Sequence, residues 1–167
     1  MAFHSSQIFQ KQTSLGNAVV WKLRLLLLFS HICKMKFNKL REISLALAPK
    51  HPTDQRCRHF SFILYKKRIL SIGVNTPKTH PLNLKHNYVN KRNIPIHDLV
   101  GTHSELSAVI KLGTDDCDGL VLVNTRVNRN NEIDLSMPCK GCRSFLETLH
   151  FKRIYYSDKH GNFLELS

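Results

Sequence analysis

The alternation of hydrophobic and polar positions divides the first half of the chain into a helix and two strands. Residues 35–49, MKFNKLREISLALAP, carry hydrophobic residues at helical spacing and predict an amphipathic helix that ends at Pro49. Residues 59–65 and 69–74 are rich in β-branched and aromatic residues, and the polar residues between them predict a hairpin. We expect the buried side of the helix to consist of Phe37, Leu40, Ile43 and Leu47.

The second half of the chain predicts two more helices and three more strands. Residues 102–113, THSELSAVIKLG, indicate a short helix that ends at Gly113. Residues 118–127, DGLVLVNTRV, form a near-continuous apolar run, which is typical of a strand buried on both faces. An amphipathic helix after PCKGC and two final strands, RIYYS and FLELS, complete the chain. This order of elements predicts a mixed sheet with helices on both faces.

Residues 1–34 differ from the rest of the chain. Their leucine run is much shorter than the roughly 20 apolar residues that span a bilayer, so we expect no membrane span. Their basic composition suits a targeting peptide, or sequence upstream of a native start at Met35. We therefore expect an N-terminal extension over residues 1–34 and one domain over residues 35–167.

Charge and cysteine content narrow the class of protein. The net charge of +13 suggests a nucleic-acid partner, but residues 1–41 hold seven of the 25 basic residues and no acidic ones. The remaining 18 basic and 12 acidic residues give only +6, so the domain itself is moderately basic. Five cysteines without a clear secretory signal favour reduced thiols or metal ligands. We expect a reducing compartment, the cytoplasm, with organellar targeting by residues 1–34 as the alternative.

A long segment, residues 76–101, shows no sustained periodicity. Segments of this length inside a compact domain are usually functional or disordered. As a lid over a small phosphate-bearing ligand it would place a basic residue, Lys91 or Arg92, on the phosphate. As a nucleic-acid groove it would stack a base on Tyr88. A solvated basic loop is the third interpretation.

The stretch PCKGC contains Cys139 and Cys142, which would suit a redox pair, half of a zinc finger or part of a catalytic metal site. The thioredoxin-like site expects a proline later in the chain, and Pro138 is the last one. A closed zinc site needs two more ligands at set spacing, and the chain has no second C-x-x-C and no H-x(3–5)-H. A catalytic zinc site needs one more ligand and a general base.

The stretch GTHSELSAV supplies both. His103 and Glu105 lie at the start of one predicted helix, as the two cysteines lie at the start of another. Thr102 with Glu105 also fits a capping box, which would make Glu105 a structural residue. The order HSE, 32 residues, then PCKGC resembles the zinc-binding motifs of the cytidine and deoxycytidylate deaminase family.

That resemblance implies a fold and a set of roles. The fold would be a three-layer α/β/α, cytidine-deaminase-like fold with a five-stranded mixed sheet whose last two strands form an antiparallel hairpin. His103, Cys139 and Cys142 would bind Zn²⁺ and Glu105 would carry protons. Asn75 matches a substrate-binding asparagine, and Ser104, where relatives have alanine, would offer its backbone N–H to the substrate.

The expected function is hydrolytic, zinc-dependent deamination of a cytosine-type base in a free nucleoside or nucleotide. One alternative is deamination of cytosine or adenine in single-stranded DNA or RNA. Another is a binding module that keeps the fold without chemistry, against which the intact Glu105 argues. The expected partner is a small nucleoside or nucleotide substrate, with nucleic acid and a homo-oligomer left open.

Overall fold

The computed structural model describes residues 37–51, 57–82 and 101–167. The expected boundary at Met35 lies outside these ranges, as do Tyr88, Lys91 and Arg92. The chain divides between Asn38 and Lys39, and the fold below is that of residues 39–167. None of the described helices is long and apolar enough to cross a membrane.

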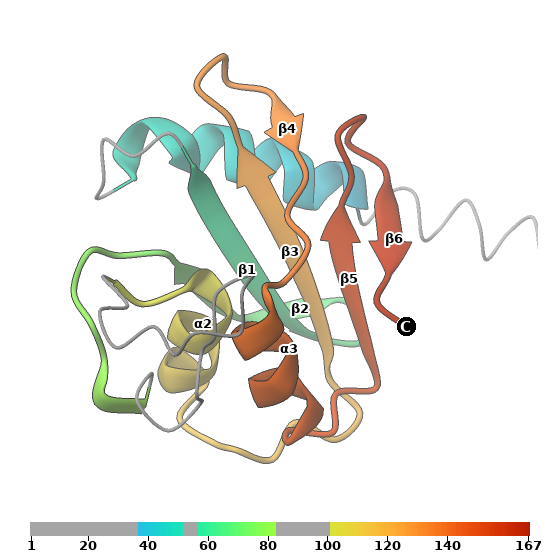
Figure 1. The fold of residues 1–167 in the computed structure, drawn as a ribbon. Helices are drawn as coiled ribbons and strands as arrows, with labels where there is room; N and C mark the ends of the chain where they lie inside the picture. The colour runs from blue at the N-terminus through green and yellow to red at the C-terminus, as the bar shows by residue number, and fades with distance from the viewer. Residues whose placement is uncertain (1–36, 52–56, 83–100) are drawn as a thin grey trace, which may run out of the picture. The chain divides into compact units, whose positions relative to one another are not determined.

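A mixed β-sheet forms the centre of the fold, with strand order β2-β1-β3-β5-β6 (Figure 1). β3 and β5 run parallel, whereas β1–β2, β1–β3 and β5–β6 are antiparallel. The mixed sheet and the final hairpin are therefore confirmed, but the sheet has six strands and not the five predicted. The strands are β1 (Arg58–Tyr65), β2 (Arg68–Val74), β3 (Val121–Val127), β5 (Arg153–Ser157) and β6 (Phe163–Glu165).

A sixth strand, β4 (Ile133–Asp134), pairs with the end of β3. The sequence did not indicate it, because two residues are too few to show a periodicity. β4 matters for the site, since it begins the segment that runs to Cys139.

Helices cover both faces of the sheet, as expected for an α/β/α fold (Figure 1). Residues 37–47 are helical and continue into the 3-10 turn η1 (Ala48–Lys50); α2 (Ser104–Leu112) and α3 (Lys140–Glu147) follow. Asn124 of β3 hydrogen-bonds to Glu105 of α2, whereas the next residue, Thr125, contacts Ser44 of the first helix. Because successive strand residues point to opposite faces, these contacts place the helices on opposite sides.

The two faces have separate cores. Under α2 and α3, Ile63 and Leu122 of the sheet pack in one cluster with Leu106, Val109, Phe145 and Leu146. On the other face lie Phe60 and Phe62, both buried, and the ring of Phe60 makes an edge contact with His51 after η1.

The first helix turns a different stripe inward from the one predicted. Leu40, Ser44 and Ala48 are buried, and Ile43 and Leu47 are only half-buried. Small side chains at the centre of the stripe allow the helix to approach the sheet closely. Ser44 remains hydrogen-bonded there, to Leu40 O at 2.8 Å and to Thr125 Oγ1 at 2.6 Å.

Gly73 fixes the height of α2 above the sheet. A Cβ atom at this position would lie 2.0 Å from Ser104 O and 2.3 Å from Ala108 N. These are backbone atoms of α2, so only glycine allows this approach. The contact lies beside the first turn of α2 and so controls the placement of Glu105.

Candidate metal centre and active site

Two helix starts bring the candidate ligands together. His103 is the N-cap residue of α2 and Cys139 is the N-cap residue of α3. Backbone hydrogen bonds between Thr76 and Thr102, 3.0 and 2.9 Å long, tie the residue before His103 to the chain after β2. At the start of α3, Cys139 Sγ accepts a hydrogen bond from Cys142 N at 3.5 Å, which sets the two cysteines in one turn.

Ser136 holds the segment that leads to Cys139 against the sheet. Its buried hydroxyl donates to Asn124 O of β3 at 2.9 Å and accepts from Ser157 N of β5 at 2.8 Å. Its own N–H donates to Ser157 O at 2.9 Å. The loop after β4 is thereby fixed to two central strands, so the start of α3 is placed relative to β3.

The three predicted metal ligands lie together. His103 Nδ1 is 3.2 Å from Cys142 Sγ and 3.6 Å from Cys139 Sγ, and all three donor atoms lie within 4.8 Å of one another. Donor atoms around a tetrahedral zinc ion are about 3.6 to 3.8 Å apart, given bond lengths of about 2.0 to 2.3 Å. One imidazole nitrogen and two sulfurs are also a donor set that suits zinc. The group could therefore hold this metal.

The charge of Cys139 agrees with such a role. The hydrogen bond from Cys142, and then that from His103, lower the pKa of Cys139 to about 4, so that this residue is a thiolate at neutral pH. The hydrogen bond with Cys139 raises the pKa of His103. A thiolate is the form of cysteine that binds metals, so the protein itself favours the ligand state of Cys139.

Glu105 lies beside the three ligands, with its side chain buried at 5% exposure. Its Oε1 accepts a hydrogen bond from Asn124 Nδ2 at 3.0 Å, and its Oε2 lies 3.3 Å from Ser104 Oγ. Burial raises the pKa of the carboxyl, and the nearby charge of His103 partly offsets this rise. A carboxyl with a raised pKa is suited to take up and release protons near neutral pH.

The capping-box interpretation of Glu105 is not seen. The N-cap of α2 has no side-chain hydrogen bond, and Thr102 Oγ1 donates instead to Lys78 O at 2.7 Å. The carboxyl of Glu105 accepts hydrogen bonds from Asn124 of β3 and from Ser104 in the first turn of α2. The described contacts of Thr102 and Glu105 are therefore not those of a capping box.

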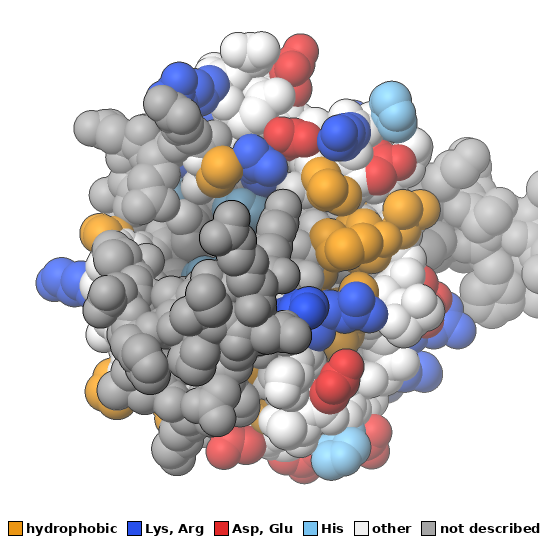
Figure 2. Space-filling model, viewed as in Figure 1, with side chains coloured by type: hydrophobic (Ala, Val, Ile, Leu, Met, Phe, Trp, Pro, Cys, Tyr) orange, Lys and Arg blue, Asp and Glu red, His pale blue; other side chains and the backbone are white. Residues whose placement is uncertain are grey.

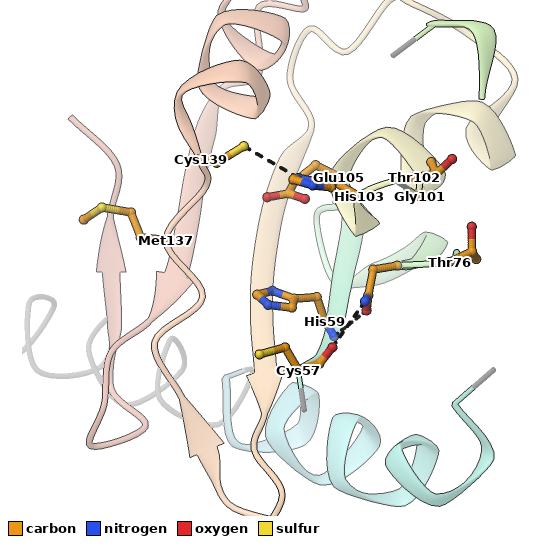
Figure 3. A pocket seen from close by; sticks show the side chains of 10 residues that line it. Cys57, His59, Thr76, Gly101, Thr102, His103, Glu105, Met137 and Cys139 are labelled. Atoms are coloured by element: carbon orange, nitrogen blue, oxygen red, sulfur yellow. Dashed lines mark hydrogen bonds between the residues drawn. The ribbon is translucent and has the colours of Figure 1, made fainter. Parts of the chain in front are cut away.

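A cavity of about 340 Å³ opens beside these residues (Figure 3). This volume is at the small end of the range for small-molecule sites. Histidine surface is visible at the bottom of a hollow in the space-filling view (Figure 2). The cavity is lined by Cys57, His59, Asn75, Thr76, Gly101, Thr102, His103, Glu105, Met137 and Cys139.

Asn75 lines this cavity, but its amide also holds the start of β1. Its Oδ1 accepts from His59 N at 2.7 Å and its Nδ2 donates to Cys57 O at 3.2 Å. Its role in binding substrate stays a prediction, as does that of Ser104. Ser104 is buried, and its hydroxyl lies 2.8 Å from Ser61 Oγ.

Two residues of the site were missed at the sequence level. His59 lines the cavity, and burial, with the charge of Arg126 second, lowers its pKa to about 4, so it is neutral at physiological pH. The described residues contain one candidate metal group, His103 with Cys139 and Cys142, and His59 does not belong to it. The second missed residue is Asn124, which donates a hydrogen bond to Glu105. Its only signal in the sequence was a polar residue directly after the apolar residues Val121, Leu122 and Val123.

Comparison with known proteins gives similarity to solved structures alone. No protein-family model and no curated protein matches the chain. A cytidine deaminase from Mycobacterium leprae is 16% identical, with a TM-score of 0.45, over 75% of this chain and 88% of that chain. A dCMP deaminase from the cyanophage S-TIM5, in apo form, is 16% identical, with a TM-score of 0.41, over 72% and 83%. At this low sequence identity and TM-score, the two structures carry no argument about chemistry. The chemistry of this chain is therefore inferred from its own side chains.

Proposed function

We propose that this chain is a hydrolytic, zinc-dependent deaminase of a cytosine-type base in a free nucleoside or nucleotide. The observation that carries the proposal is the placement of Glu105. A buried carboxyl lies in the wall of a cavity, beside one imidazole and two thiols that could hold a metal ion. Hydrolytic removal of an amino group from a heterocyclic base uses this combination of three metal ligands and a carboxyl.

Each residue has a defined role in this proposal. His103, Cys139 and Cys142 would hold zinc, which when bound would lower the pKa of water and so supply a nucleophile near neutral pH. Glu105 accepts a proton from the attacking water and delivers it to the ring nitrogen next to the reacting carbon. A C–O bond forms and the C–N bond to the amino group breaks. One water proton remains on the ring nitrogen and the other leaves with ammonia.

The volume of the cavity and the residues that line it favour a monomeric substrate over a polymer. The volume of about 340 Å³ suits a single small molecule, and the described residues that line it include no lysine or arginine to follow a phosphate backbone. The neutral imidazole of His59 and the amide of Asn75 are polar groups without formal charge, which can hydrogen-bond to an uncharged base. Lys91, Arg92 and Tyr88 stay candidates for binding of a 5′-phosphate or a base.

A substrate panel tests the proposal. Purified, zinc-loaded protein is incubated with cytidine, deoxycytidine, their monophosphates, adenosine and single-stranded oligonucleotides, and ammonia release is measured. Turnover of a cytosine monomer with a shallow dependence on salt is the expected result. Turnover of oligonucleotides alone, with activity that collapses as salt rises, would instead favour the polymer substrate. No turnover of any of them would favour a binding module.

The metal assignment has its own test. We expect about one zinc ion per purified chain, and Cys142→Ser should lose most of it, because a hydroxyl replaces one of three protein ligands. The measurement is metal content by mass spectrometry. Cys117 is a buried free thiol outside the candidate group, so Cys117→Ser is the matched control and should keep its zinc. Full zinc occupancy in Cys142→Ser would contradict the assignment.

A further inference from the structure

Four polar side chains form a buried network behind the cavity. Ser61 comes from β1, Asn124 from β3, and Ser104 and Glu105 from the first turn of α2. Asn124 is 1% exposed and is the link between the strands and the carboxyl. Its Nδ2 lies 3.0 Å from Glu105 Oε1 and its Oδ1 lies 2.7 Å from Ser61 Oγ. Both ends of the amide are therefore paired, as burial demands.

Counting protons fixes the orientation of this network. The amide oxygen of Asn124 can only accept, so the single hydroxyl proton of Ser61 is donated to it. Ser61 Oγ also lies 2.8 Å from Ser104 Oγ, and Ser104 Oγ donates to Glu105 Oε2 at 3.3 Å. A flipped amide would set its oxygen against the carboxyl oxygen of Glu105, and two acceptors repel. The nitrogen of Asn124 must therefore face Glu105.

Asn124 donates to Glu105 Oε1 at 3.0 Å, a shorter contact than the 3.3 Å hydrogen bond that Ser104 Oγ donates to Oε2. The thiol of Cys142 and the backbone N–H of Glu105 also hydrogen-bond to the carboxyl. A glutamate has three side-chain torsions, and an unheld carboxyl would occupy several rotamers. Asn124 itself is rigid, because it lies on the central strand β3 between the buried residues Val123 and Thr125.

We propose that Asn124 is a positioning residue that holds the Glu105 carboxyl at the cavity wall, in the geometry needed to pass protons to the substrate. The inference rests on the proposed deaminase function. It also gives a reason for a buried amide on the side of β3 that faces α2. An amide suits the task because it donates a hydrogen bond without adding a charge beside the metal ligands.

Kinetics of two matched variants test this role. Asn124→Ala removes the donor to Glu105, whereas Ser61→Ala breaks the same network without touching the carboxyl. For Asn124→Ala we expect kcat to fall about 10- to 100-fold, as a displacement of about 1 Å can do, with KM changed less than about threefold. Ser61→Ala should keep kcat within about threefold. Both variants should retain about one zinc ion per chain.

A double variant separates positioning from general damage. Once Glu105→Ala has removed the carboxyl, adding Asn124→Ala should cause no further loss of the residual activity. An additional loss of tenfold or more would show that Asn124 acts otherwise, and the positioning role would be wrong. An equal fall of kcat in Asn124→Ala and Ser61→Ala would also overturn it.

Crystal structures of the variants give a readout that does not depend on activity. We expect the Glu105 carboxyl to be displaced, or to occupy more than one rotamer, in Asn124→Ala, and to keep a single position in Ser61→Ala. An unmoved carboxyl in Asn124→Ala would overturn the inference even if activity had fallen. Inactivity of the unaltered protein on every substrate would count against the proposed deaminase function, and these structures would still decide the positioning role.

Discussion

The two faces of the central sheet are built from the same strands but do different work. Ser61 and Phe62 are neighbours on β1, and Asn124 and Thr125 are neighbours on β3. In each pair the first residue faces α2 and the candidate site, and the second faces the first helix. A step of one residue therefore separates a polar network from a core, because side chains alternate along a strand.

The difference lies in how polar atoms are distributed. Toward the first helix, large apolar side chains dominate, and Thr125 with Ser44 provides an isolated polar contact. Toward α2 and α3, one end of the face is apolar, at Ile63 and Leu122, and the other end carries the network around Glu105. Buried polar groups cost stability unless they are paired, so under the proposed function this end would serve chemistry and the other face stability.

The largest effect that would support this division is a loss of catalysis without a loss of stability. Glu105→Gln keeps the size of the side chain and an oxygen that can accept from Asn124, but cannot carry a proton. We expect deamination to fall about 1,000-fold or more, with zinc content and melting temperature nearly unchanged. Steady-state kinetics beside thermal melts provide the measurement. A variant that unfolds while keeping its activity per folded molecule would show that Glu105 is structural.

The opposite face should give the opposite result. Phe62 is fully buried toward the first helix, so Phe62→Ala should lower the free energy of unfolding by about 3 to 5 kcal/mol, from lost burial and the cavity left behind. Chemical denaturation gives this value. At a temperature where the variant remains folded, kcat should equal that of the unaltered protein. A large fall in kcat would mean that the two faces are not independent.

Local patterns in the sequence predicted the elements of the fold and the group of candidate ligands. The spacing within the H-x-E and P-C-x-x-C motifs is enough to identify His103, Cys139 and Cys142 as a group, and their donor atoms do lie together in the fold. Strand and helix periods predicted the order of elements, and the apolar run DGLVLVNTRV predicted a strand buried on both faces.

What could not be predicted depends on contacts between distant segments. Asn124 interacts with Glu105 only because Gly73 lets α2 approach the sheet closely, and no local pattern reports that distance. The buried stripe of the first helix is centred on Ser44 because Thr125 of β3 hydrogen-bonds to its hydroxyl. In the sequence His59 resembles an ordinary strand residue, and only the pairing of β1 with β3 places it at the cavity.

A prediction with an effect of intermediate size concerns His59, on the face of the sheet that carries the candidate site. Burial lowers its pKa to about 4 from 6.5, so the folded protein prefers the neutral ring and the unfolded chain binds the proton first. Stability should therefore be complete above about pH 6.5 and fall as the pH drops toward 4, by up to about 3 kcal/mol. His59→Gln has no such group and should lose less stability over this range. Thermal melts from pH 7 to pH 4 give the comparison, and equal pH slopes would contradict it.

Thr125→Val should have the smallest effect, although the residue is the direct neighbour of Asn124. Ser44 donates its only hydroxyl proton to Leu40 O, so Thr125 is the donor in the 2.6 Å contact with Ser44 Oγ. Valine removes that donor but keeps the β-branched shape, and it leaves no buried N–H or O–H without an acceptor. We expect a loss of about 1 kcal/mol or less in denaturant unfolding.

The kinetic result for Thr125→Val should be equally clear. Its side chain faces the first helix, so kcat should stay within about twofold of the unaltered protein, whereas Asn124→Ala, one residue away, should lose about 10-fold or more. The comparison holds strand, depth and neighbours nearly constant and changes only the face. A fall in kcat for Thr125→Val as large as that for Asn124→Ala would show that β3 transmits damage as a whole. Activity would then depend on the packing of the strand and not on which helix its side chains meet.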